Sequence, residues 1–173
     1  RIAVLGQKGG TGKSTLCRLV ATAYAAHDWE TVIADLDTGQ GTTLNWARRR
    51  LDAGITPTVQ AQSFSEVSKA VGKLDGAYDL IVFDSGPRAT NLTRKAAEAS
   101  ALVLIPTGTG LDDLAPSVAL ANEMKAKGID RKRIAFCLCR VGPSAAELEE
   151  AREYLTASGY RLLAGVVLER TCL

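Results

Sequence analysis

Short apolar runs alternate along the chain with longer amphipathic stretches. The apolar runs predict strands near residues 1–5, 31–35, 57–61, 79–84, 101–106, 133–139 and 162–168. The stretches between them predict helices near residues 13–27, 42–53, 64–75, 89–98, 112–127 and 144–158. Runs of consecutive apolar residues are typical of strands that are buried on both faces. Regular alternation of strand and helix therefore predicts an α/β fold with a doubly wound, mostly parallel sheet flanked by helices on both faces.

The length and composition fit one soluble domain. Of the 173 residues, 46% are hydrophobic and 23% are charged, which is ordinary for a globular protein. No apolar stretch approaches the roughly 18–20 residues needed to span a bilayer, and no signal-peptide pattern opens the chain. We find no repeat or linker, so we expect residues 1–173 to form a single domain in the cytoplasm. The chain enters a strand at Arg1 without a Met, so we expect it to be trimmed at this end.

The segment after the first predicted strand carries the clearest chemical signal. It reads Lys8-Gly9-Gly10-Thr11-Gly12-Lys13-Ser14-Thr15. Glycines allow successive backbone N–H groups to curl around a β-phosphate, and a helix that opens at Lys13 directs its positive dipole end at the same charge. Lys13 is placed to neutralise the β- and γ-phosphate oxygens, and the Ser14 hydroxyl to ligate Mg²⁺. Together these features predict a P-loop that binds a nucleoside triphosphate.

A second lysine in this segment narrows the interpretation. A usual P-loop has Gly five residues before the Gly of Gly-Lys, where this chain has Gln7 followed by Lys8. The string resembles the deviant Walker A motif of the ParA/MinD superfamily of dimerising ATPases. The resemblance implies that Lys8 reaches across a dimer interface to the nucleotide bound by the partner. The simpler alternative is a solvated surface lysine, but a cation beside a glycine-rich phosphate loop favours the first interpretation.

Acidic residues at two further strand ends fit this resemblance. Asp37 matches the second aspartate of the family motif Asp-x-Asp-Pro-Gln, which helps to position the attacking water. Thr38-Gly39 replaces the single proline of that motif, so we expect a loop that is one residue longer. Asp84 closes an apolar run and resembles Walker B, which implies that it holds Mg²⁺ through water. Asp35, which also stands at a strand end, could belong to the same acidic motif or could simply be a turn or cap residue.

Two arginines are weaker candidates for the site. Arg88 follows Ser85-Gly86-Pro87, which matches the small and proline residues of the family's switch II loop, but Arg88 itself fits no family pattern. It either senses the γ-phosphate or forms a surface ion pair. Arg140 follows the strand near 133–139, where relatives place residues that touch adenine. The guanidinium of Arg140 could stack on a purine, or it could form a surface ion pair.

Four cysteines, at positions 17, 137, 139 and 172, suggest no disulfide framework. Cys137 and Cys139 share one face of a predicted strand, which could indicate a metal or iron–sulfur site. No neighbouring Cys or His completes a set of ligands. We therefore expect buried small residues in a reducing compartment.

The charge pattern bears on nucleic-acid binding. The net charge is only +2, so the chain is not a strongly basic DNA-binding module. Local runs occur at Arg48-Arg49-Arg50 and Arg131-Lys132-Arg133. Such runs are usually solvated faces, but the resemblance makes them candidates for non-specific contact with DNA phosphates. The smaller ParA proteins usually continue beyond the last strand, so we expect the C-terminal end to be truncated.

The resemblance implies an ATPase of DNA segregation, closest to the short ParA-type partition proteins. It would bind ATP or ADP with Mg²⁺, and Lys8, Lys13 and Asp37 would carry a weak basal hydrolysis. Its expected partners are a second copy of itself, as an ATP-dependent dimer or a polymer, a centromere-binding ParB-type protein and non-specific DNA, without membrane contact. A MinD-like positioning ATPase with an amphipathic helix is one alternative. Another is a small-molecule enzyme of the superfamily, similar to dethiobiotin synthetase or the nitrogenase iron protein.

Overall fold

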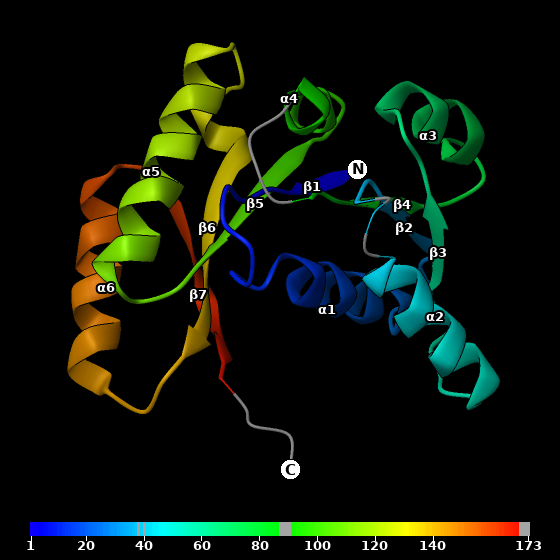
Figure 1. Cartoon of the computed structure of the whole chain (residues 1–173), viewed down its shortest axis with the longest axis horizontal. Helices are drawn as coiled ribbons and strands as arrows, with labels where there is room; N and C mark the ends of the chain where they lie inside the picture. Colours follow the sequence, from blue (N-terminus) through cyan, green and yellow to red (C-terminus); the bar gives the residue numbers. More distant parts are fainter. Residues whose placement is uncertain (38, 40, 87–90, 170–173) are drawn as a thin grey trace.

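Parallel strands form a single sheet through the centre of the molecule (Figure 1). The computed structural model describes residues 1–37, 39, 41–86 and 91–169. Within these residues the sheet has seven strands: β1 (Ile2–Val4), β2 (Thr31–Asp35), β3 (Gln60–Ser63), β4 (Leu80–Asp84), β5 (Leu102–Thr107), β6 (Ile134–Val141) and β7 (Arg161–Leu168). Their order is β3-β2-β4-β1-β5-β6-β7, and every pair is parallel. The predicted doubly wound sheet is confirmed, with β1 in the middle.

The helices lie close to the predicted ranges. They are α1 (Lys13–Ala25), α2 (Thr42–Asp52), α3 (Val67–Leu74), α4 (Asn91–Glu98), α5 (Leu111–Ala126) and α6 (Ala145–Ala157), with a 3₁₀ turn, η1, at Arg131–Arg133. The largest displacement is in β3, which we predicted at 57–61 and which is found at Gln60–Ser63. This edge strand is polar and largely exposed, and it is defined by its pairing with β2 rather than by an apolar pattern.

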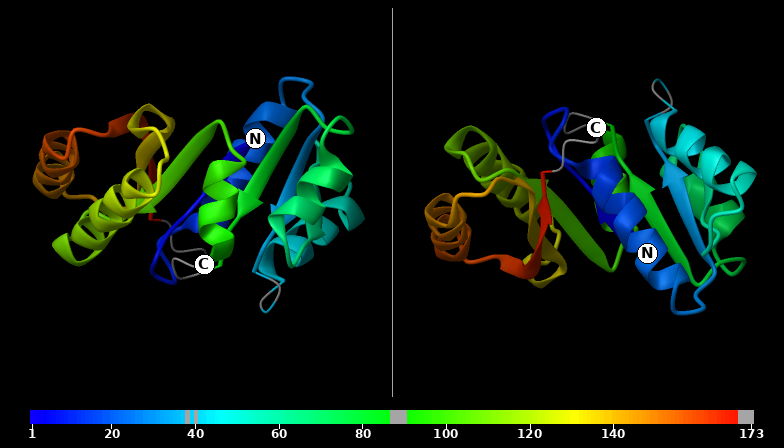
Figure 2. Two further views of the ribbon diagram at one scale, coloured as in Figure 1. Left: turned by 90° about the horizontal axis from the view of Figure 1, so that it is seen from above. Right: turned by 90° about the horizontal axis from the view of Figure 1, so that it is seen from below.

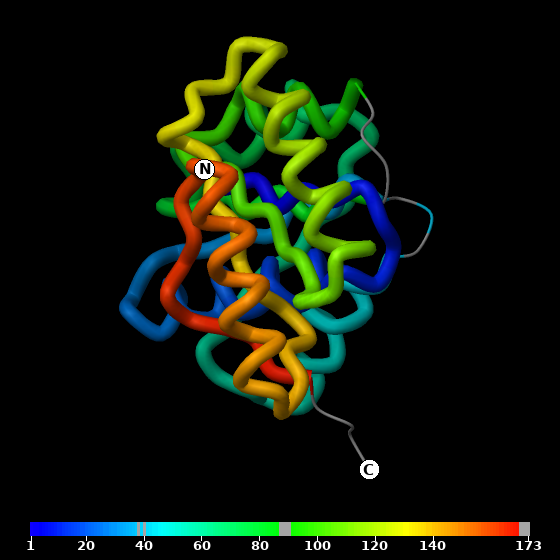
Figure 3. The backbone as a smooth tube through the Cα atoms, turned by 90° about the vertical axis from the view of Figure 1, so that its left-hand side faces the viewer, coloured from blue at the N-terminus to red at the C-terminus, as the bar shows by residue number. Residues whose placement is uncertain are grey.

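The helices cover both faces of the sheet, as predicted. One face packs on α1 and α2 through strand residues such as Val4, Ile33 and Val82. The other face packs on α3, α4, α5 and α6 through residues such as Ala3 and Phe83. Figure 2 shows the two faces from opposite sides, and Figure 3 shows α5 and α6 side by side. Alternate residues of each strand therefore serve two separate apolar clusters, which explains the continuous apolar runs in the sequence.

The carboxyl ends of three central strands meet at one edge of the sheet. Asp84 of β4 lies in register with Asp35 of β2 on one side and with Val4 of β1 on the other. The loops that follow these strands therefore begin side by side. In an open α/β sheet, this edge is where ligands bind.

The structure describes three of the four cysteines. Cys17, Cys137 and Cys139 are free and buried, as expected, and Cys172 lies outside the described residues. Among the helices that the structure describes, none is both long enough and apolar enough to cross a membrane.

Candidate functional site

The loop between β1 and α1 has the backbone that a phosphate cradle requires. Gly10 and Gly12 adopt φ angles of +78° and +94°, a region that side-chain-bearing residues rarely enter. A Cβ added to Gly12 would lie 3.1 Å from the Cβ of Cys139, so glycine also allows the loop to pack closely on β6. Helix α1 begins at Lys13 with no side-chain cap and no acidic residue in its first turn. Its N-terminal N–H groups are therefore suited to an anion.

A pocket of about 260 Å³ lies at this helix terminus. Its lining residues are Gly9, Gly10, Gly12, Lys13, Ser14, Thr15, Asp37, Ser85 and Arg140. Most of the predicted site residues are thus brought together from four separate segments: the β1–α1 turn with the start of α1, the loops after β2 and β4, and the end of β6. Lys8, Thr11 and Asp84 are outside this lining: Thr11 and Asp84 are buried behind it, and Lys8 lies on the side of α5.

Lys13 supplies the positive charge of the pocket. Its side chain is largely buried, and Nζ donates a hydrogen bond to the carbonyl oxygen of Lys8 at 2.6 Å. Burial lowers the pKa of Lys13, while the nearby carboxylates of Asp84 and Asp37 oppose that shift. The acidic neighbours therefore favour the charged ammonium in a position where it can meet phosphate oxygens.

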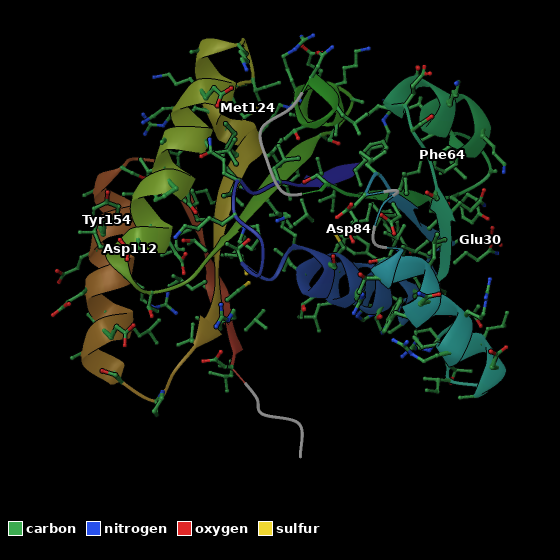
Figure 4. All side chains as sticks on the ribbon, viewed as in Figure 1. Glu30, Phe64, Asp84, Asp112, Met124 and Tyr154 are labelled. Atoms are coloured by element: carbon green, nitrogen blue, oxygen red, sulfur yellow. The ribbon has the colours of Figure 1, made fainter. Side chains whose placement is uncertain are left out.

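Asp84 is buried behind the pocket with one oxygen satisfied and one unsatisfied. Its Oδ2 accepts a hydrogen bond of 2.6 Å from Thr43 Oγ1. Its Oδ1 is buried and has no hydrogen-bond partner. An unpaired carboxylate oxygen in the interior is costly, so it marks a position that a further donor would stabilise. Figure 4 shows Asp84 between β4 and the start of α2.

These residues fit a magnesium site. Mg²⁺ keeps several of its waters and is held by one or two protein oxygens together with nucleotide phosphates. The unpaired Oδ1 of Asp84 can accept from such a water, and Ser14 lines the pocket with a hydroxyl. The metal would neutralise charge on the phosphate oxygens there.

Asp35 supports the loop that carries Asp37. The Asp35 side chain is only 2% exposed, and its Oδ1 accepts the backbone N–H of Asp37 at 2.9 Å. This is the geometry of an Asx turn, in line with the simpler role considered for Asp35. Burial raises the pKa of Asp35 to about 6, and the neighbouring Asp84 and Asp37 add to the shift.

Lys8 is bound by its own chain. Its Nζ donates to the carbonyl oxygen of Asp112 at 2.5 Å and to Asp113 Oδ1 at 3.1 Å, both in the first turn of α5. The side chain is still 46% exposed. Lys8 is therefore neither a free solvated lysine nor part of the pocket of this single chain. The P-loop runs between Asp112 on α5 and Asp84 on β4 (Figure 4).

Arg140 joins the phosphate pocket to a second hollow. It adopts a φ of +57°, and its guanidinium donates to Glu169 Oε1 at 3.0 and 3.2 Å and to the Gly10 carbonyl oxygen at 3.4 Å. The adjacent hollow, about 690 Å³ in volume, is lined by Gly12, Thr15, Leu19, Cys139, Arg140, Val166, Val167, Leu168 and Glu169. The ion pair that we considered is present, and the guanidinium also borders a largely apolar space beside the P-loop.

The sequence analysis assigned no site role to two polar residues of this region. Ser85 lines the pocket and donates from Oγ to the carbonyl oxygen of Val4 at 2.8 Å. Thr43 binds Asp84 across 41 positions of the chain. The place of Ser85 after Asp84 was a usable signal, whereas a threonine in a helix's first turn ordinarily indicates a cap. Arg88, the candidate γ-phosphate sensor, lies outside the described residues.

Comparisons with known proteins give the family and the fold. A family model, the CobQ/CobB/MinD/ParA nucleotide binding domain, matches residues 2–173. A comparison with curated protein sequences finds no match. Solved structures with the same fold include a Borrelia burgdorferi protein assigned to plasmid partition and bound to AMPPNP, with TM-score 0.75, 19% identity, and 98% of this chain and 84% of that chain covered.

Two more solved structures show the same architecture. MinD of Pyrococcus horikoshii, complexed with Mg-ADP, has TM-score 0.68 and 18% identity, with 88% of this chain and 76% of that chain covered. A ParA family ATPase of Chlorobium tepidum has TM-score 0.73 and 18% identity, with 98% and 85% covered. At such identities the likeness establishes the fold. Since the family model spans nearly the whole sequence, this chain belongs to the CobQ/CobB/MinD/ParA nucleotide-binding domain family, in the ParA/MinD superfamily of ATPases.

Proposed function

We propose that this protein is an Mg²⁺-dependent ATPase that dimerises on ATP and acts as a molecular switch in DNA segregation, like the short ParA-type partition proteins. The observation that carries the proposal is the convergence of three groups on one pocket. Lys13 and Asp37 line it, and the unpaired oxygen of Asp84 lies behind it. A cation, a water-orienting carboxylate and a metal-holding carboxylate are the parts that phosphoryl transfer to water requires.

Nucleotide binding follows from the P-loop. Backbone N–H groups of residues 9–15 and the Lys13 ammonium hold the β- and γ-phosphates. Ser14 and Asp84 hold Mg²⁺, the latter through water. The apolar hollow beside Arg140 suits the flat ring of a purine, with Leu19 and Val166 on its walls. Adenine is chosen over guanine because of the family.

Hydrolysis is assigned to Asp37 together with a second subunit. Asp37 faces the pocket from a loop anchored by Asp35, so its carboxylate can orient a water toward the γ-phosphate. Lys8 is proposed to leave the first turn of α5 and to contact the nucleotide bound by the partner. A cation supplied in trans stabilises negative charge that develops in the transition state.

The partners of the switch are proposed from the family and from surface charge. Arg48 and Arg49 of the first basic run are exposed, whereas Arg50 is drawn onto Trp46 and the Pro57 carbonyl oxygen. In the second run, Arg133 binds backbone carbonyls at the end of α4. The first run therefore leaves Arg48 and Arg49 for DNA phosphates. In the second run Lys132 is exposed, and the exposed Arg131 also lies over the ring of Tyr160, 5.6 Å from its centroid. A ParB-type activator, cytoplasmic location and association with a nucleoid or plasmid belong to the same proposal.

Calorimetry with ATP and ADP in Mg²⁺ tests the foundation of this proposal. Lys13→Ala removes the charge that faces the phosphates, so nucleotide affinity is expected to fall at least about tenfold. Lys69→Ala, an exposed lysine on α3, is the matched control and is expected to bind as the wild type does. Unchanged affinity in Lys13→Ala, or absence of ATP hydrolysis by the wild type with and without DNA, would overturn the proposal.

A further inference from the structure

The loop that carries Asp37 is fastened at both ends to two neighbouring carboxylates. Asp35 and Asp84 lie opposite each other in register at the ends of β2 and β4. At the start of the loop, the Asp37 N–H binds Asp35 Oδ1 at 2.9 Å. At its end, Thr43 Oγ1 binds Asp84 Oδ2 at 2.6 Å. Asp37 and Thr43 therefore each contact one of the two acidic strand ends.

The Thr43 hydroxyl is committed to Asp84 and not to its own helix. Helix α2 has Gly41 as its N-cap, with a φ of +56° and no side-chain cap hydrogen bond. Thr43 is 1% exposed, so its hydroxyl cannot exchange this partner for water. Thr42, the preceding residue in the same turn, is exposed. Of two adjacent threonines, only the buried one reaches the carboxylate.

This contact decides which Asp84 oxygen remains for a metal-bound water. Oδ2 is taken by Thr43, and the buried Oδ1 has no partner. A hydrogen bond from a neutral hydroxyl fixes the rotation of the carboxylate without neutralising its charge. Fixing a group that holds a metal through its waters is the usual task of residues in the surrounding layer.

We infer that Thr43 is a positioning residue: from the start of α2 it orients the Asp84 carboxylate toward Mg²⁺. The inference rests on the proposed function, because it takes Asp84 as the residue that holds Mg²⁺. A substitution at Thr43 should therefore weaken Mg²⁺ binding and leave phosphate binding by the P-loop almost unchanged. A threonine that merely anchored α2 would affect both to the same extent.

The test measures ADP binding by calorimetry, once with Mg²⁺ and once with EDTA. Thr43→Val removes the hydroxyl and keeps the shape of the side chain, Thr43→Ser keeps the hydroxyl, and Thr42→Val is the matched control. Wild type, Thr43→Ser and Thr42→Val are expected to gain the same affinity from Mg²⁺. In Thr43→Val the increase in ADP affinity that Mg²⁺ causes is expected to be about tenfold smaller than in the wild type, which is the usual cost of removing such a supporting contact. The ADP affinity of Thr43→Val in EDTA is expected to stay unchanged.

The outcomes separate this inference from the proposed function. Equal Mg²⁺ gain in Thr43→Val and wild type, or an equal loss with Mg²⁺ and with EDTA, overturns the positioning role. No Mg²⁺ gain in the wild type contradicts the proposed function instead. If thermal unfolding shows that Thr43→Val does not fold, Thr43→Cys replaces it, since a thiol is a weak donor. A Mg²⁺ gain in Thr43→Cys equal to that of Thr43→Ser would then overturn the inference.

Discussion

At the scale of single residues, three carboxylates near Lys13 differ because their surroundings differ. Asp37 lines the pocket, Asp84 is bound by Thr43, and Asp35 is buried beneath the loop between them. Burial raises the pKa of Asp35, and the like charges of its neighbours add to that effect. Different environments thus suit chemically identical side chains to separate tasks.

The raised pKa of Asp35 predicts how stability changes with pH. Because folding raises this pKa from 3.8 to about 6, the protonated acid stabilises the native state. The contribution is complete below the unfolded value and is lost as the pH rises through the folded value. In buffer free of metal and nucleotide, the wild-type free energy of unfolding is expected to fall between about pH 4 and pH 7 by about 2 kcal/mol more than that of Asp35→Asn.

Denaturant unfolding across this pH range measures the difference. Asp52→Asn, an exposed aspartate on α2, is the control and is expected to follow the wild type. Parallel pH profiles for the wild type and Asp35→Asn would show that Asp35 does not titrate as stated.

Asp37 gives a prediction about turnover. Asp37→Ala is expected to keep ATP affinity within about twofold, because the phosphates are held by Lys13 and the P-loop backbone, while hydrolysis falls at least about a hundredfold. Phosphate release and ATP calorimetry on the same protein measure both quantities, with Asp52→Ala as the control. Full hydrolysis in Asp37→Ala would show that Asp37 does not orient the attacking water.

The sequence predicts the residues of the P-loop without help from the structure, because their signal is local. The order of glycines, lysine and hydroxyl carries the chemistry within eight positions. It was insufficient for Thr43 and for the contact of Lys8 with α5. Thr43 and Asp84 are 41 positions apart, and Lys8 and Asp112 are 104 positions apart. Such pairs depend on which strands become neighbours, which no local pattern of one sequence specifies.

At the scale of elements, the helices were predictable because each is amphipathic and ends near a turn residue. Gly54, Gly128 and Gly159 follow α2, α5 and α6 with positive φ angles, the conformation that glycine adopts most readily. The edge strand β3 was displaced by three residues at its start, since its sequence Gln-Ala-Gln-Ser lacks an apolar run. The order of strands in the sheet also cannot be predicted from local sequence patterns, because it is set by packing between distant segments.

The contact of α1 with α2 yields a prediction on stability. Trp46 of α2 lies between Arg18 of α1 and Arg50, whose guanidinium carbons are 5.5 and 5.2 Å from its ring centroid. Trp46→Ala removes both cation–π contacts and part of an apolar cluster, so the free energy of unfolding is expected to fall by about 2–3 kcal/mol.

Chemical denaturation followed by circular dichroism measures this change. The matched control is Trp29→Ala, since Trp29 is 45% exposed and its ring packs edge-on against the ring of Tyr24. That variant is expected to lose less than about 1 kcal/mol. Equal losses in the two variants would show that the arginines contribute nothing measurable at Trp46.

At the scale of the whole molecule, the segment after β1 holds two lysines, Lys8 and Lys13, that point in different directions. Lys13 faces the pocket of its own chain, whereas Lys8 lies on the α5 side with nearly half of its side chain exposed. Its ion pair with Asp113 is partly exposed, and exposed pairs contribute at most about 1 kcal/mol. Lys8 Nζ also donates to the Asp112 carbonyl oxygen, so a stronger anion must replace both contacts before Lys8 leaves α5.

Lys8 thus supplies the prediction that separates a dimerising switch from an ordinary P-loop enzyme. If Lys8 contacts the partner's phosphates, its charge matters only when two ATP-bound subunits meet. Lys8→Ala is expected to bind ADP as the wild type does but to remain monomeric with a non-hydrolysable ATP analogue, and its hydrolysis is expected not to respond to DNA.

Sedimentation velocity measures the dimer, with Lys127→Ala at the far end of α5 as the control. In other NTPases a trans-acting cation can raise the hydrolysis rate by about 10³–10⁵, and we expect a smaller rate enhancement in a slow switch. Dimers of Lys8→Ala equal to those of the wild type would leave a nucleotide-binding protein whose choice between partition and small-molecule chemistry rests on other residues.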